Sequence, residues 1–231
     1  RTPQSPDSFG AWLRQLPLKS PEARIRLFDG RRKLWQHALY QVVDLPIGDK
    51  DLQQCADVAI RLRSDYLRSR GRTDEIAFNF TSGDRARYTD WVRGMRPVVN
   101  GNSVTWNTSA PPDSSHAGYR QYLNTVFTYA GSYSLSKELP RVGDIGRVSP
   151  GDCFIKGGFP GHVIMVADVA VDTASGDKLV MLMQGALPAQ DIHVIRNYRN
   201  DELNPWFRVG EGQYLMAAGW IFNWTELHRF H

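Results

Sequence analysis

The hydrophobic and polar positions of this chain follow two different periods. Between residues 49 and 71 the apolar side chains recur every three or four positions, which is typical of one face of a helix. The segment 119–139 shows the same spacing, with an interruption at Gly131. From Gly151 onward the apolar positions form short runs separated by turn residues, which predicts strands. This order predicts an α+β fold, with helices first and then an antiparallel sheet or partly closed barrel.

The rest of the pattern predicts one domain over residues 1–231. Residues 1–8 are rich in Pro and Ser and are expected to form an extended arm. Two alternating segments, 24–30 and 37–48, predict strands that pair as a hairpin. Residues 85–118 are rich in Asn, Ser, Pro and Gly, so we expect a long irregular loop, and long loops in compact domains are often functional.

The helix predicted at 49–71 carries Cys55 near its start, with Asp49 or Asp51 as the expected N-cap. A helix N-terminus lowers the pKa of a thiol and favours the nucleophilic thiolate. Cys55 also falls on the apolar stripe of the helix, and free cysteines are often buried. A nucleophile and a core residue therefore both remain open for Cys55.

A second feature is the stretch GDCFIKGGFPGHVIMVADVAV, in which His162 stands where a glycine-rich loop enters an apolar strand. The next strand, LVMLMQ, ends at Gln184, and the turn TASGDK joins the two. Such a hairpin predicts that His162 and Gln184 are neighbours. A polar group beside an imidazole orients it in cysteine and serine hydrolases. We therefore predict Cys55, His162 and Gln184 as nucleophile, base and orienting residue.

Six further residues are predicted to contact a substrate. The amide of Gln54, next to Cys55, is suited to stabilise an oxyanion. Gly161 leaves room for a ligand beside His162. The remaining four are a polar pair on the next connection and two aromatic residues of the expected loop: Gln190, Asp191, Trp91 and Trp106.

Composition and charge narrow the classes of partner. The net charge of +4 suits an anionic polymer, whereas the basic residues do not form the aromatic-interleaved face of a nucleic-acid-binding protein. No run of about 18 apolar residues predicts a membrane-spanning helix. The two cysteines and six histidines lack metal-site spacing, so we expect no metal or other cofactor. Because the chain begins at Arg1 without Met, we expect that the sequence starts either after a removed leader or at an artificial boundary.

The order of a cysteine-bearing helix, a GD…GHV strand and a polar residue that ends the next strand resembles the papain-like wall hydrolases of the CHAP and NlpC/P60 families. The resemblance implies a cysteine amidase or endopeptidase that acts on peptidoglycan. In those enzymes the helix begins at the cysteine, with small or Ser/Thr residues after it. The stretch QQCADV departs from that pattern at Cys55.

A second resemblance covers most of the chain. The stretches FGAWLRQLPLK, DLQQCADVAIRLRSDYL, YLNTVFTYAGSYSL and QGALPAQDIHVI, among others, resemble the domain-of-unknown-function 4846 family of bacterial proteins. That resemblance implies an exported protein, in the periplasm or associated with the outer membrane, with a lipid anchor on the removed leader as one option. The family has an aliphatic residue where Cys153 stands, which implies a structural role for this cysteine.

Two other functions stay open at this point. One is a carbohydrate or ester hydrolase on the same scaffold, in which His162 works with a carboxylate such as Asp191 or Asp152; glycoside hydrolysis requires two carboxylates about 5–9.5 Å apart. The other is a non-catalytic protein of the cell envelope that binds a glycan or a partner protein through residues 85–118.

Overall fold

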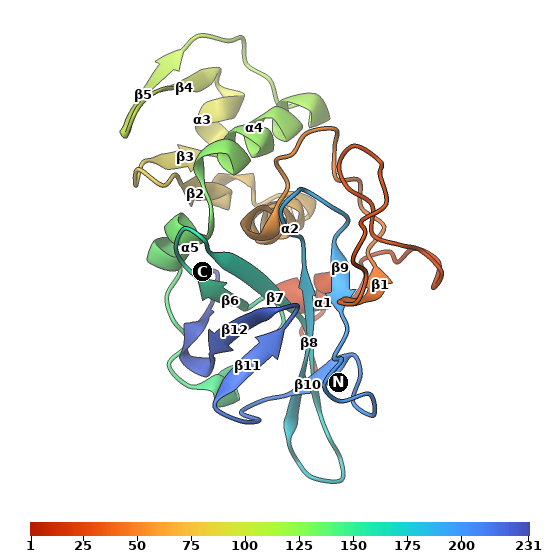
Figure 1. Ribbon diagram of the computed structural model, residues 1–231. Helices are drawn as coiled ribbons and strands as arrows, with labels where there is room; N and C mark the ends of the chain where they lie inside the picture. The colour runs from red at the N-terminus through yellow and green to blue at the C-terminus, as the bar shows by residue number, and fades with distance from the viewer.

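An antiparallel sheet lies at the centre of the computed structural model, which describes residues 1–231 (Figure 1). The strands run in the order β1-β9-β8-β7-β6-β13, and β10 pairs with β8. Their bounds are β1 Leu39–Val42, β6 Cys153–Lys156, β7 His162–Val171, β8 Lys178–Gln184, β9 His193–Ile195, β10 Trp206–Arg208 and β13 Leu227–His228. The predicted antiparallel sheet is confirmed, but closure into a barrel is wrong because β1 and β13 do not pair and leave two edges.

Five helices and three small hairpins complete the fold. The helices are α1 Phe9–Leu13, α2 Cys55–Ser69, α3 Tyr88–Val92, α4 His116–Tyr129 and α5 Ser132–Glu138, with short 3-10 turns η1 Thr73–Glu75, η2 Ile145–Arg147 and η3 Trp224–Glu226. The hairpins pair β2 Ala77–Asn79 with β3 Arg85–Arg87, β4 Met95–Asn100 with β5 Ser103–Thr108, and β11 Tyr214–Ala217 with β12 Trp220–Asn223. None of the helices is long and apolar enough to cross a bilayer.

The predicted order of helices before strands is wrong, because β1 precedes α2 and two hairpins lie between α2 and α4. The predicted irregular loop at 85–118 is wrong as well. Its residues form β3, α3 and the β4–β5 hairpin, which turns at Gly101 with a φ of 58°. β5 carries mostly polar side chains and β4 contains Pro97, so the alternation expected of a strand is weak in the sequence.

The predicted hairpin of 24–30 with 37–48 does not form. Residues of the first segment pair instead with the chain just after them, through a bridge between Arg26 and Arg32. The second segment supplies β1, which pairs with β9 from the far end of the chain, with Val42 opposite His193. That pairing spans about 150 residues and leaves no local signal.

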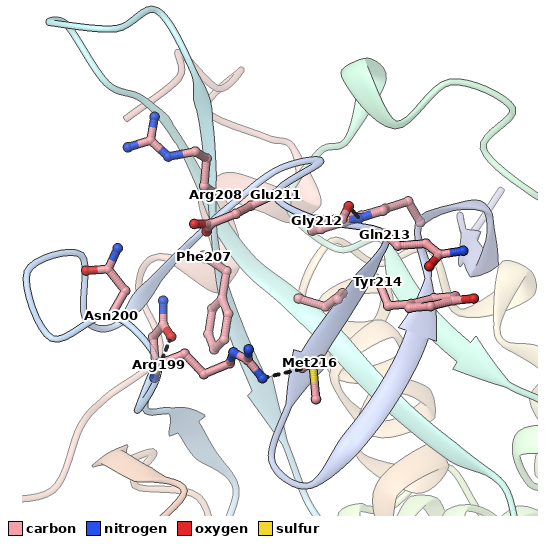
Figure 2. A pocket seen from close by; sticks show the side chains of 12 residues that line it. Arg199, Asn200, Phe207, Arg208, Glu211, Gly212, Gln213, Tyr214 and Met216 are labelled. Atoms are coloured by element: carbon pink, nitrogen blue, oxygen red, sulfur yellow. Dashed lines mark hydrogen bonds between the residues drawn. The ribbon is translucent and has the colours of Figure 1, made fainter.

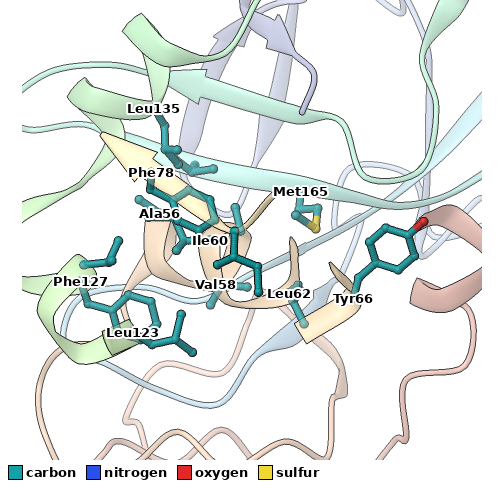
Figure 3. Packing of buried hydrophobic residues seen from close by; sticks show 14 of the residues in the cluster. Ala56, Val58, Ile60, Leu62, Tyr66, Phe78, Leu123, Phe127, Leu135 and Met165 are labelled. Carbon is teal, nitrogen blue, oxygen red and sulfur yellow. The ribbon is translucent and has the colours of Figure 1, made fainter. Parts of the chain in front are cut away.

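Two hydrophobic cores cover opposite faces of the sheet. Alternate residues of β7 enter different cores: Val163 and Met165 pack with α2, whereas Ile164 and Val166 pack with the β11–β12 side. Figure 3 shows the first core, in which one side of α2 packs toward the sheet and α4 covers another. Its labelled side chains include Ala56, Val58, Ile60, Leu62, Leu123 and Phe127. The sheet thus carries α2 on one face and a small hairpin on the other.

Helix α2 begins at Cys55, later than the predicted Asp49 or Asp51. Its N-cap is Gln54, whose backbone N–H donates to the carboxylate of Asp57 at 2.9 Å. The aspartates upstream lie in turns, and Asp51 instead accepts the backbone N–H of Ala189 at 2.6 Å. The cysteine therefore occupies the first position of the helix.

The start of α2 fits where β7 and β8 separate. The two strands pair from Met165 and Met183 onward toward their hairpin. Beyond that point, toward Gln184, β8 pairs with β9 only, so a gap opens beside β7. Gly185 lies in this gap, and a Cβ atom on it would meet Val58 at 2.7 Å and the backbone oxygen of Gln54 at 3.1 Å. A glycine is needed here for the helix start to approach the sheet.

Replacing Gly185 by alanine should therefore destabilise the protein. The added methyl group would displace Val58 and the first turn of α2, and overpacking of this kind costs about 1–3 kcal/mol. Urea denaturation followed by circular dichroism measures the change. The matched control is Gly143→Ala, at an exposed position with no atom near its Cβ, where we expect a change within about 0.5 kcal/mol. Equal stability of the two variants would contradict the close approach.

Candidate active site

Cys55 lies against β7 where β7 and β8 separate, beside the residue that follows His162. The thiol of Cys55 accepts a hydrogen bond from the backbone N–H of Val163, the residue that follows His162. The backbone N–H groups of Ala56 and of Cys55 itself also face the sulfur. The thiol makes no hydrogen bond with the imidazole in this structure, and its residue is partly exposed. Cys55 thus lies among amide donors, one of which belongs to the residue after His162.

The imidazole of His162 is held on two sides. Its Nε2 lies 2.6 Å from Oε1 of Gln184, as the predicted hairpin geometry requires. The indole of Trp220 stacks on one face of the ring, with centroids 4.7 Å apart and planes inclined by 7°. Both His162 and Gln184 are only 4% exposed. The ring is therefore fixed in position, and its hydrogen bond to Gln184 is shielded from water.

The amide of Gln184 continues to a second histidine. Its Nε2 lies 3.3 Å from Nε2 of His193, the first residue of β9. Nδ1 of His193 lies 3.1 Å from the backbone oxygen of Asp191, and the ring is fully buried. Three side chains from three adjacent strands thus form one buried polar row. The position of His193 in an alternating strand gives no signal in the sequence beyond that of an ordinary sheet residue.

Burial sets the protonation of these groups. It raises the pKa of the Cys55 thiol, against the opposing effect of the Val163 amide. It lowers the pKa of His162 to about 4, opposed by the hydrogen bond to Gln184 and aided by the nearby charge of Lys33. It also lowers the pKa of His193 to about 4. At neutral pH the site therefore holds a neutral thiol and two neutral imidazoles.

Of the other predicted contact residues, two lie beside the site. The side chain of Gln54 donates to Asp51, at 3.2 Å to Oδ1, so its amide is not directed at an oxyanion. Gly161 lies directly before His162, and a Cβ atom there would meet the Ser132 hydroxyl at 2.1 Å and the backbone oxygen of Gly158 at 2.6 Å. The glycine therefore serves close packing against α5 as well as the approach to the histidine.

The next two predicted residues, Gln190 and Asp191, are buried within the fold. Gln190 is fully buried, and its side-chain amide has no hydrogen-bond partner. Asp191 is 2% exposed; its carboxylate pairs with Lys19 at 2.9 Å and accepts the backbone N–H of Arg26 at 2.8 Å. The carboxylate of Asp191 is thus engaged elsewhere, and this residue meets His193 through its backbone only.

The aromatic residues of the site differ from the predicted ones. Trp91 is buried beneath the guanidinium of Arg96, and Trp106 stacks on Phe80, so neither touches His162. Trp220 takes that position instead. The signal in the sequence is the Ala218-Gly219 pair directly before it. These residues form a two-residue turn, with φ of 51° and 83°, that folds β12 back on β11.

The carboxylates proposed for a glycosidase do not form a pair beside His162. Asp152 is buried and bound by the guanidinium of Arg229 at 2.7 Å, and Asp191 is held as described above. No group of three or more His, Cys, Asp or Glu side chains is arranged to hold a metal ion.

A cavity of about 410 Å³ lies elsewhere, beside β10 and β11 (Figure 2). Arg199 crosses it and donates to the sulfur of Met216 at 2.9 Å, while Phe207 and Tyr214 supply apolar surface. Glu211 is the one carboxylate in its lining, so this cavity has no acidic pair either. Neither it nor the other main cavities are lined by Cys55, His162 or Gln184.

Comparison with known proteins adds a family. A family model described as domain of unknown function (4846) matches residues 1–229. The chain belongs to this family. The match covers both the helix start at Cys55 and the row from His162 to His193, so all of the site lies within the DUF4846 domain. No curated protein and no solved structure matches the chain.

The histidines of this DUF4846 domain should make its stability depend on pH. Unfolded histidine binds a proton near pH 6.5, whereas folded His162 and His193 do so only near pH 4. The free energy of unfolding should therefore fall as the pH drops from 6.5 to 4, by up to roughly 3 kcal/mol per histidine. Urea denaturation at pH 7, 5.5 and 4.5 measures this dependence.

Removing one of these groups by His193→Gln should make the dependence shallower. The matched control is His37→Gln, at an exposed histidine, which should leave it unchanged. The same slope in both variants would show that His193 titrates as it does in the unfolded chain.

Proposed function

We propose that this protein is a papain-like cysteine hydrolase that cleaves an amide or peptide bond. The observation that carries the proposal is the position of Cys55 at the first residue of α2, with its sulfur against the backbone N–H of Val163, the residue after His162, whose ring is bound to Gln184. A nucleophile, a base and a group that orients the base are the requirements of this reaction class. In the wall hydrolases the helix begins at the cysteine. Because α2 begins at Cys55 and not further upstream, this chain is similar to them in that feature.

The protonation of the site decides how the reaction starts. Because the thiol and imidazole are both neutral at rest, His162 must take the thiol proton as the sulfur of Cys55 attacks the carbonyl carbon. The resulting oxyanion is stabilised by backbone N–H groups at the start of α2, where the helix dipole also favours negative charge. The imidazolium then gives its proton to the leaving amine, and a thioester remains on Cys55. Water, deprotonated by His162, then attacks the thioester; the C–S bond breaks, the acid leaves, and the imidazolium returns its proton to the sulfur of Cys55.

The proposed substrate is an amide or peptide bond of peptidoglycan, and the proposed location is the bacterial cell envelope. The resemblance to wall hydrolases and the net charge of +4, which suits an anionic polymer, support this choice. The carboxylates of Asp152 and Asp191 are already held in ion pairs with Arg229 and Lys19, respectively. This favours a cysteine mechanism over a carbohydrate or ester hydrolase, which would depend on those carboxylates.

Hydrolysis of purified muropeptides, followed by mass spectrometry, tests the proposal. Cys55→Ala should abolish product formation, because no other group in the site supplies a nucleophile. His162→Ala should lower kcat by about 10²–10⁴, the usual contribution of a general base. Retention of wild-type turnover by Cys55→Ala would exclude the mechanism.

Thiol labelling with iodoacetamide provides an assay that needs no substrate. Cys55 should be alkylated in the folded protein, whereas Cys153 is fully buried and should react only after unfolding. Cys153 thus serves as the internal control, and Cys153→Ala should keep full turnover of muropeptides. A Cys55 that reacts only together with Cys153 would be a core residue and not a nucleophile.

A second candidate function is binding without catalysis. A cavity of about 440 Å³ between the loop before α2 and α4 favours it, because amide, hydroxyl and cationic side chains gather there around Trp91. These polar residues are Lys50, Arg96, Gln121, Asn124, Thr125 and Thr128. Binding of wall fragments that is lost in Asn124→Leu and retained in Cys55→Ala would support this function.

A further inference from the structure

We infer that His193 is a positioning residue that selects which nitrogen of His162 accepts a proton. This inference rests on the proposed function for its role in catalysis, but its structural content does not. It follows from the row of four groups described above, in which the backbone of Asp191, His193, Gln184 and His162 are joined by hydrogen bonds.

The row has one fixed end. The group 3.1 Å from Nδ1 of His193 is the backbone oxygen of Asp191, and a carbonyl oxygen can only accept. Nδ1 of His193 must therefore carry a hydrogen. Because burial keeps this imidazole neutral at pH 7, its Nε2 carries none and can only accept.

That assignment determines the orientation of the Gln184 amide. Only its NH₂ group can donate to the bare Nε2 of His193, at 3.3 Å. Its oxygen must then face His162, where it accepts a hydrogen from Nε2 at 2.6 Å. Turning the amide over would place its NH₂ against a nitrogen that already carries a hydrogen, if the His162 tautomer stayed the same.

The tautomer of His162 determines whether its other nitrogen, Nδ1, can accept a proton. A neutral imidazole with a hydrogen on Nε2 has its lone pair on Nδ1, and Nδ1 has no hydrogen-bond partner in the protein. Nδ1 is therefore the nitrogen that can accept a proton, which in the proposed reaction is the proton of Cys55. The opposite tautomer would present an N–H group at Nδ1, which cannot act as a base.

The backbone explains why the order cannot reverse. His193 lies opposite Gln184 in the pairing of β8 with β9, and opposite Val42 in the pairing of β9 with β1. The residue lies on a strand between two others, and its ring is fully buried. The ring therefore cannot turn and exchange its hydrogen-bond partners for water. A main-chain carbonyl thus determines the tautomer of a side chain three hydrogen bonds away.

Long-range ¹H–¹⁵N correlation spectra of the full chain, labelled with ¹⁵N-histidine at pH 7, test the inference directly. We expect opposite tautomers: a hydrogen on Nε2 in His162 and on Nδ1 in His193. The spectra of His162→Gln and His193→Gln assign the two residues. A hydrogen on Nδ1 of His162 in the wild-type protein would overturn the inference without any variant.

Two variants separate control of the tautomer from general damage. His193→Phe removes the acceptor, so the Gln184 amide is free to turn and His162 should become a mixture of tautomers. His193→Gln places an amide oxygen near the former Nε2 and should restore the single tautomer. In Gln184→Glu/His193→Phe a carboxylate, which only accepts, should keep the hydrogen on Nε2 of His162. A His162 tautomer unchanged by His193→Phe would contradict the inference.

Turnover of muropeptides then separates the two proposals. With the wild-type tautomers as expected, His193→Phe should lower kcat about 10-fold or more at unchanged KM, since a wrong tautomer costs up to about 10⁴ in a related triad. His193→Gln should recover most of the loss. If Cys55→Ala has no effect on turnover, the proposed function fails, while the spectra still decide the role of His193.

Discussion

The close approach of the α2 start to the gap between β7 and β8 is the constraint on which the rest of the structure depends. Gly185 permits this approach, and the backbone N–H of Val163 meets the thiol of Cys55 there. Without the gap, the strands would pair to their ends and the helix would pack on the face of the sheet alone. The same gap lets His162 and Gln184 come together on the opposite face. One local irregularity in strand pairing thus accommodates the start of α2 on one face of the sheet and the His162–Gln184 pair on the other.

How much of this could be predicted from the sequence depends on the range of the interactions. The neighbourhood of His162 and Gln184 follows from a single hairpin, and short-range pairing of this kind is readable from alternation and a turn. The start of α2 was placed too early because an aspartate is a good N-cap, whereas here Asp51 accepts from Ala189, more than 130 residues away. Such long-range competition for a capping group has no local trace.

The remaining features depend on contacts between distant segments. Trp220 covers His162 because β12 folds back on β11 and the hairpin then lies over the sheet, and only the turn at Gly219 is visible in the sequence. The partnership of His193 with Gln184 requires the register of β8 with β9. Polar residues in a buried row are costly unless each one is satisfied, and this row meets that condition at each nitrogen except Nδ1 of His162.

The stacking of Trp220 has a geometric consequence for any molecule that reaches His162. The indole covers one face of the ring, and Gln184 occupies its Nε2 edge. Access to the imidazole is therefore one-sided: of the two ring nitrogens, only Nδ1 is left for a molecule that reaches the ring. The hairpin that carries Trp220 thereby fixes the side from which the imidazole can be reached, whereas a freely rotating histidine would have no such preference.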